Sequence, residues 1–157
     1  MAPPGYVAVT VHHMARYAAA MERRRIPSGS PFEPVIGFSR AVAVGDRILV
    51  SGTAPIMPGD ADPPTDAGDQ ARRCLEIVLE ALAAAGAGPD DVVRTRTYLV
   101  DAADWEAVGR AHGEVFGDVR PTSTMVVVAG LLDPRWRVEF EAEAILGGNG
   151  GRRDGHR

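Results

Sequence analysis

The chain has 157 residues, of which 45% are hydrophobic and 24% charged, and its formal net charge at pH 7 is −4. This size and balance fit one soluble globular domain and exclude a disordered chain; no apolar run approaches the roughly 20 residues that a bilayer span needs. The acidic charge also argues against a nucleic-acid partner, because phosphate binding depends on clustered positive charge.

Lysine is absent and cysteine occurs once, which excludes further chemistry. All 17 basic residues are arginine, so no lysine can form a Schiff base with a carbonyl substrate or with pyridoxal phosphate. Cys74 alone cannot form an internal disulfide or a thiolate metal site, and it lies on the apolar side of a helical pattern. We therefore expect a cytoplasmic protein with a buried structural thiol, no metal and no cofactor.

Residues 1–24 are predicted to form a flexible N-terminal extension. Their apolar stretch is interrupted by His12, His13 and Arg16, and no basic segment precedes it, unlike a secretory signal peptide. The histidine pair has no carboxylate nearby, and adjacent residues rarely face one ion, so we do not expect metal binding there. Because Met21 directly precedes the recognisable domain, a start at Met21 is an alternative to a start at the first residue.

The first half of the domain has the pattern of a hairpin followed by a helix. Residues 35–50 predict a strand, a turn at Gly45-Asp46 and a second strand that ends near Ser51. After a loop rich in proline, glycine and aspartate, apolar residues recur at steps of three and four. This periodicity predicts an amphipathic helix that ends at Gly86; its apolar residues are Ala71, Cys74, Leu75, Val78 and Leu82.

The second half predicts a strand at 92–100, a helix that ends at Gly117, and strands at 123–129 and 137–146. Asp101 or Asp104 can cap the helix. The tail, residues 147–157, is rich in glycine and polar, so we expect it to be disordered. The resulting order ββαβαββ predicts an α+β fold with two helices packed on one face of a sheet.

The last two strands suggest that the other face of the sheet is also covered. In the strand at 137–146 apolar residues alternate with Glu139, Glu141 and Glu143, so the helix-free face carries three carboxylates. The strand at 123–129 is apolar on both faces, which is typical of burial on both sides. Symmetric association of subunits would cover it, with Arg94 and Arg96 as candidate partners of the glutamates.

Four segments, in order and spacing, resemble the Rid family, also called YjgF and formerly L-PSP. They are residues 37–55, 82–86, 91–101 and 138–144, and the resemblance extends over roughly residues 25–146. It implies a chorismate-mutase-like fold and a homotrimer with a central barrel, with three intersubunit clefts for a small-molecule ligand. Family members with activity hydrolytically deaminate reactive imines and enamines derived from amino acids.

The same resemblance identifies candidate site residues and a departure from the family pattern. Glu139 matches a glutamate of the family cleft and is the candidate catalytic residue. Active deaminases carry an arginine where this chain has Ser123, and a neutral hydroxyl cannot replace the charge that holds a substrate carboxylate. The chain therefore resembles a divergent subgroup. The ligand-binding candidates are Phe38, where a tyrosine is frequent, Met125, where a cysteine is frequent, and Gly52, Arg120 and Ser123.

Two further residues have alternative interpretations. Arg120 is the cation nearest to Ser123 in sequence, and it is either a loop-bracing arginine or a rim residue that meets an anionic ligand. His112 fits a half-buried packing residue better than a general base. The function hypotheses are an imine or enamine deaminase-like hydrolase on a substrate other than simple 2-imino acids and, alternatively, a non-catalytic or regulatory metabolite-binding trimer. Ribonuclease activity, suggested by the older family name, fits an acidic chain poorly.

Overall fold

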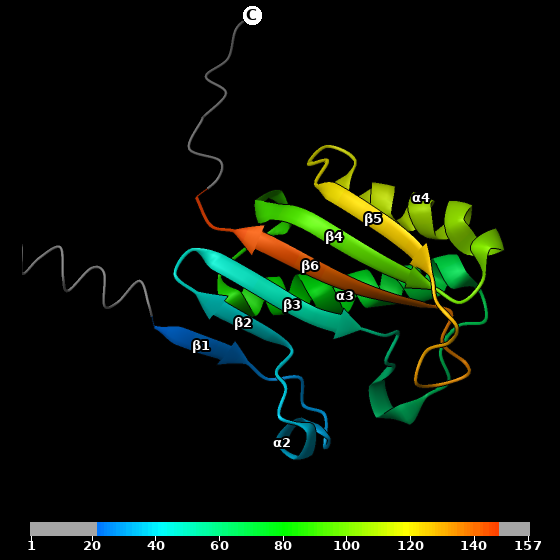
Figure 1. Cartoon of the computed structure of the whole chain (residues 1–157), viewed down its shortest axis with the longest axis horizontal. Helices are drawn as coiled ribbons and strands as arrows, with labels where there is room; N and C mark the ends of the chain where they lie inside the picture. The colour runs from blue at the N-terminus through cyan, green and yellow to red at the C-terminus, as the bar shows by residue number, and fades with distance from the viewer. Residues whose placement is uncertain (1–21, 148–157) are drawn as a thin grey trace, which may run out of the picture.

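The computed structural model describes residues 22–147, which form one sheet with helices on one face (Figure 1). The sheet has six strands in the order β1-β2-β3-β6-β4-β5. Neighbouring strands pair antiparallel, except that β4 and β5 are parallel and are joined by a helical crossover. The strands are β1 (Arg23–Ile26), β2 (Ala41–Val44), β3 (Arg47–Thr53), β4 (Val92–Leu99), β5 (Thr122–Val127) and β6 (Val138–Ile145).

Two long helices cover one face, which confirms the predicted α+β architecture. The α-helices are α2 (Glu33–Ile36), α3 (Ala67–Ala85) and α4 (Trp105–Phe116), and the 3-10 helices are η1 (Pro58–Asp60), η2 (Pro89–Asp91) and η3 (Ala102–Asp104). Helix α3 starts after Asp66, whose carboxylate accepts a hydrogen bond from the Asp69 N–H at 3.0 Å. It ends at Gly86, whose φ of 90° favours glycine.

The two aspartates before α4, which the sequence predicted as alternative helix caps, make different contacts. Asp101 accepts a hydrogen bond from the Ala103 N–H at 2.9 Å and so caps η3. Asp104 makes no capping bond, and its carboxylate instead accepts two hydrogen bonds from Arg137, at 2.8 and 2.9 Å. The helix start is thereby tied to the residue that precedes β6.

Two segments near the N-terminus differ from the prediction. Val35 and Ile36 lie in the short helix α2 and not in a strand, because Pro34 favours a helix start and Gly37 ends it at a φ of 82°. The edge strand β1 was not predicted, since its RRRI sequence lacks an apolar alternation. The expected domain boundary at residue 25 falls inside β1, and the flexible extension and disordered tail lie almost wholly outside the described residues.

The core lies between the sheet and the two long helices. The predicted alternation on β6 is confirmed, since Val138, Phe140, Ala142 and Ala144 are each at most 3% exposed. Cys74 on α3 is fully buried beneath this strand, its Sγ lies 3.7 Å from the Val138 carbonyl oxygen, and burial raises the pKa of the thiol. The cysteine is therefore the structural thiol that the sequence predicted.

A bulge in β4 decides which of its residues face the core. The pairing register with β6 shifts between Val92 and Arg94, so Val92 is buried and Val93 is 40% exposed. A regular alternation along β4 would place Val93 on the same face as Thr95, and the bulge removes Val93 from that face. Helices of the described part, residues 22–147, are all too short or too polar to cross a membrane.

Candidate functional site

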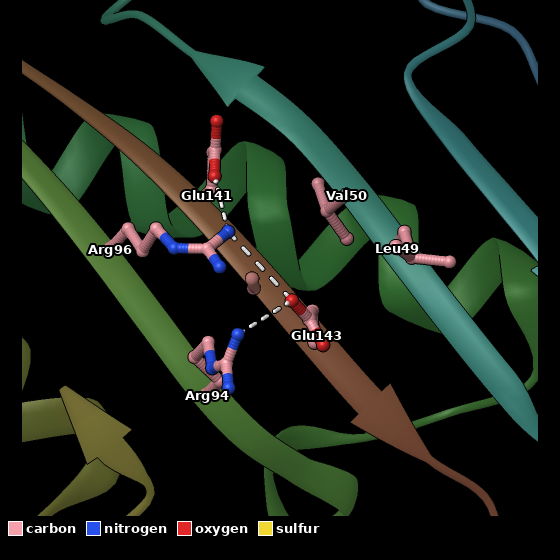
Figure 2. A pocket seen from close by; sticks show the side chains of 7 residues that line it. Leu49, Val50, Arg94, Arg96, Glu141 and Glu143 are labelled. Atoms are coloured by element: carbon pink, nitrogen blue, oxygen red, sulfur yellow. Dashed lines mark hydrogen bonds and ion pairs between the residues drawn. The ribbon is translucent and has the colours of Figure 1, made fainter. Parts of the chain in front are cut away.

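The helix-free face of the sheet carries a ladder of charged side chains, which Figure 2 shows. Arg96 contacts Glu141 at 3.0 Å and Glu143 at 3.7 Å, and Arg94 contacts Glu143 at 3.4 Å. They surround a hollow of about 50 Å³ that Leu49, Val50 and Ala142 also line. Arg94 and Arg96 are thus partners of the glutamates, as expected, and the pairing occurs within one chain.

Glu139 stands apart from this ladder. Among residues 22–147 it makes no ion pair, and its side chain is half-buried. Burial raises the pKa of its carboxyl group, the charge of Glu141 raises that pKa further, and Arg40 acts in the opposite direction. A carboxyl with a raised pKa exchanges a proton closer to neutral pH, which is what acid/base work requires.

Gly52 makes room for this carboxylate. A Cβ atom at position 52 would overlap Glu139 Oε1 and would lie 3.1 Å from Glu139 Cδ. The register of β3 against β6 is irregular between Val50 and Thr53, so Gly52 lies within the irregular stretch. Gly52 and Glu139 are both candidates from the sequence, and the structure brings the two together.

Arg40, which was not among the candidates from the sequence, supports the same region from the core. It is only 8% exposed, and its Nη1 donates hydrogen bonds to the Gly52 carbonyl oxygen at 3.2 Å and to Thr53 Oγ1 at 2.9 Å. Burial lowers the pKa of the guanidinium, while the charge of Glu139 opposes that shift. The feature of the sequence that could have identified Arg40 is a basic residue directly before the apolar strand β2.

A second polar cluster lies at the β5 edge of the sheet. Thr95 Oγ1 is 3.1 Å from Ser123 Oγ and 2.9 Å from His112 Nε2. The imidazole packs on Phe116 with ring centroids 4.8 Å apart, and burial lowers the pKa of His112. The histidine is half-buried, as predicted, but it also belongs to a hydrogen-bonded group.

The two clusters face opposite sides of the sheet. Ser123 is in register with Thr95, and Thr95 is in register with Ala142, so Ser123 shares the face that the helices cover. Glu139 is in register with Tyr98 on the helix-free face. A single chain therefore does not close one site from both clusters.

The remaining candidates divide between these two regions. Phe38 is half-buried and follows Gly37 in the connection from α2 to β2, on the β3 side of the sheet. Met125 packs partly against the core from β5. Arg120 is exposed, has a φ of 53°, and donates from Nε to the Gly117 carbonyl oxygen at 3.2 Å. Arg120 thus braces the end of α4 and does not contact Ser123.

This strand order, with two helices on one face, defines the class of the protein as an α+β domain of the YjgF type. A solved structure of Rv2704 from Mycobacterium tuberculosis, described as a member of the YjgF/YER057c/UK114 family, superposes with a TM-score of 0.73 at 40% identity. The match covers 80% of this chain and 100% of that one.

Sequence comparisons lead to the same family. The family model described as Endoribonuclease L-PSP matches residues 29–146. The uncharacterized protein SCO2049 of Streptomyces coelicolor is 44% identical over 79% of this chain and 92% of its own. The 2-iminobutanoate/2-iminopropanoate deaminase of Escherichia coli is 28% identical over 69% of this chain and 86% of its own. The chain belongs to the Rid (YjgF, L-PSP) family.

Proposed function

We propose that this Rid-family protein is a homotrimer that hydrolyses a small reactive imine or enamine in clefts between subunits, and that the substrate is not a simple 2-imino acid. The observation that carries the proposal is the Glu139 carboxyl, which is half-buried, unpaired among the described residues and held against Gly52. The relative that deaminates 2-iminobutanoate and 2-iminopropanoate supports the class of reaction.

In this proposal Glu139 handles the protons of the hydrolysis. Its carboxylate accepts a proton from a cleft water as the water oxygen forms a bond to the imine carbon. The protonated carboxyl donates that proton to the nitrogen, so the carbon–nitrogen double bond becomes the single bond of a carbinolamine. The carboxylate then passes the proton of the new hydroxyl group to the nitrogen, the carbonyl double bond forms as the remaining carbon–nitrogen bond breaks, and a carbonyl compound and an amine or ammonia leave. The raised pKa of Glu139 makes its carboxylate a stronger base toward the cleft water than an ordinary carboxylate.

A trimer is proposed because a lone chain leaves part of its apolar surface uncovered. Val126 and Val127 on the edge strand β5 are 43% and 54% exposed, and β5 has a neighbour on one side only. Association of copies would cover this edge, and it would also let a Ser123 cluster of one subunit approach a Glu139 of another. Light scattering on a size-exclusion peak should give three times the chain mass; a monomer or a stable dimer would contradict the intersubunit cleft.

The decisive experiment compares two glutamates of the same strand and face. Glu139→Gln should lower the rate of imine hydrolysis about 10²- to 10⁴-fold, the usual contribution of a general acid or base. Glu143→Gln is the matched control, since Glu143 is occupied by ion pairs to Arg47 and Arg94. Imine loss is followed against the uncatalysed rate, and equal losses in the two variants would refute the role of Glu139.

The substrate restriction is tested at Ser123. On an imine generated in situ by an amino-acid oxidase, the wild type should show little activity and Ser123→Arg should gain it. A charge-assisted hydrogen bond contributes about 1.5–3 kcal/mol, or roughly ten- to hundredfold. Robust wild-type activity on such imines would contradict the restriction.

A non-catalytic, metabolite-binding trimer is the alternative outcome of the same experiments. It would show as a trimer in which neither the wild type nor the Ser123→Arg variant accelerates imine loss. Cleavage of RNA, which the family description names, is not proposed, because the net charge of −4 disfavours binding of a polyanion.

A further inference from the structure

A row of hydrogen bonds connects the interior of the protein with its surface at β5. Thr95 Oγ1 lies between His112 Nε2, at 2.9 Å, and Ser123 Oγ, at 3.1 Å. Thr95 is 1% exposed, whereas Ser123 is exposed. The row therefore begins at a half-buried imidazole and ends at a hydroxyl that a ligand can reach.

The hydrogen bonds of this row can have either of two donor–acceptor orientations, because the Thr95 hydroxyl has one proton to donate and two neighbours. If Thr95 donates to His112, the imidazole proton is on Nδ1, which has no hydrogen-bond partner within residues 22–147. If the His112 Nε2–H donates to Thr95, then Thr95 donates to Ser123, and Nδ1 keeps only a lone pair. The second direction pairs each donor with a protein acceptor up to the Ser123 hydroxyl, whose own proton is left free.

The surroundings hold the imidazole in the orientation that the row requires. The ring lies 4.8 Å from the Phe116 ring and 6.4 Å from the Phe140 ring, with an angle of 14° to the latter. Burial lowers the pKa of His112, so the imidazole is neutral near pH 7. A hydroxyl that accepts one hydrogen bond donates another more strongly, so the row polarises Ser123.

We propose that His112, Thr95 and Ser123 form a hydrogen-bond relay that presents the Ser123 hydroxyl proton to the ligand, which offers it an uncharged acceptor such as a carbonyl oxygen or an imine nitrogen. Ser123 is the residue that contacts the ligand, and Thr95 and His112 position it. A neutral donor stabilises a bound carboxylate much less than a guanidinium does. The assignment of the ligand class depends on the intersubunit cleft proposed above, whereas the relay itself does not depend on that cleft.

The relay is tested on the free protein by nitrogen NMR of histidine-labelled samples, with the His112 signals assigned through His112→Gln. The expected spectrum is that of the Nε2–H tautomer. Thr95→Val should shift these signals, Thr95→Ser should restore them, and Thr97→Val, two residues along the same strand, should leave them unchanged. A wild-type Nδ1–H tautomer, or equal spectra for Thr95→Val and Thr97→Val, would overturn the relay.

The ligand class is tested with propanamide and propanoate, which have similar shapes and differ in charge. At pH 7.5 the wild type should bind propanamide more tightly, and Ser123→Ala should weaken that binding about three- to tenfold, as expected for one hydrogen bond. Tighter or equal binding of propanoate, no effect of Ser123→Ala, or binding of neither probe would overturn the ligand class. Because the NMR test needs no turnover, an inactive enzyme would count against the proposed hydrolysis and leave the relay standing.

Discussion

The two faces of strand β6 differ in almost every property although they alternate along eight residues. On one face Phe140, Ala142 and Ala144 are at most 3% exposed beneath the helices. On the other face Glu141 and Glu143 pair with arginines across the sheet. The covered face supplies the free energy of folding through apolar burial, and the helix-free face holds charges whose net contribution to stability is small. Substitutions on the two faces should therefore affect different measurements.

The largest effect on stability is expected from Phe140→Ala. The Phe140 side chain is fully buried between the sheet and the helices, so its removal leaves a cavity. Such substitutions cost about 3–5 kcal/mol, and denaturant unfolding should report this loss. A cost below about 1 kcal/mol would show that the covered face does not dominate stability.

Gly52→Ala should affect activity strongly and stability little. The new Cβ would overlap Glu139 Oε1, and the end of a glutamate side chain can move away with little effect on the fold. Hydrolysis should fall toward the level of Glu139→Gln, by about 10²-fold or more, while the unfolding midpoint changes little. Gly88→Ala is a control, since no atom lies within 4 Å of its added Cβ. Full activity of Gly52→Ala would show that the position of the carboxylate does not matter.

Thr97→Val should stabilise the protein. This result would sharpen the comparison between the two faces, because Thr97 is a polar residue on the face that the helices cover. Its Oγ1 is buried without a hydrogen-bond partner among the described residues. Leaving such a group unpaired costs about 1–3 kcal/mol, so replacing it by a methyl group should raise the free energy of unfolding by about 1–2 kcal/mol. A destabilised variant would indicate that the hydroxyl has a partner in solution.

The smallest effect is expected in the pH dependence of stability at Glu139. The pKa of its carboxyl is raised in the folded state, so the folded chain binds the proton more tightly than the unfolded chain does. The stability contribution is thus fully present below the ordinary pKa of 4.5 and is lost as pH rises through the raised value. Glu139→Gln should remove this loss, so the stability of the variant relative to the wild type should increase as pH rises above 4.5; a difference in stability that stays constant with pH would contradict the raised pKa.

The sequence by itself determined the alternation of β6, both long helices with their glycine ends, and the α+β class, because apolar periodicity reports directly which side is buried. It also determined the family, through residues 37–55 and 138–144. It did not determine β1 or α2: edge pairing supplied by a neighbouring strand leaves little trace in a four-residue segment, and one proline next to a glycine decides a short helix.

Only the tertiary structure decided which candidates meet. Gly52 and Glu139 come together because β3 pairs with β6, and Thr95 reaches Ser123 and His112 because β5 returns parallel to β4 after the α4 crossover. Arg40 became a site residue only when the fold buried it beneath Gly52. These contacts join residues far apart in the chain, and such contacts follow from strand order and register, which local periodicity does not specify.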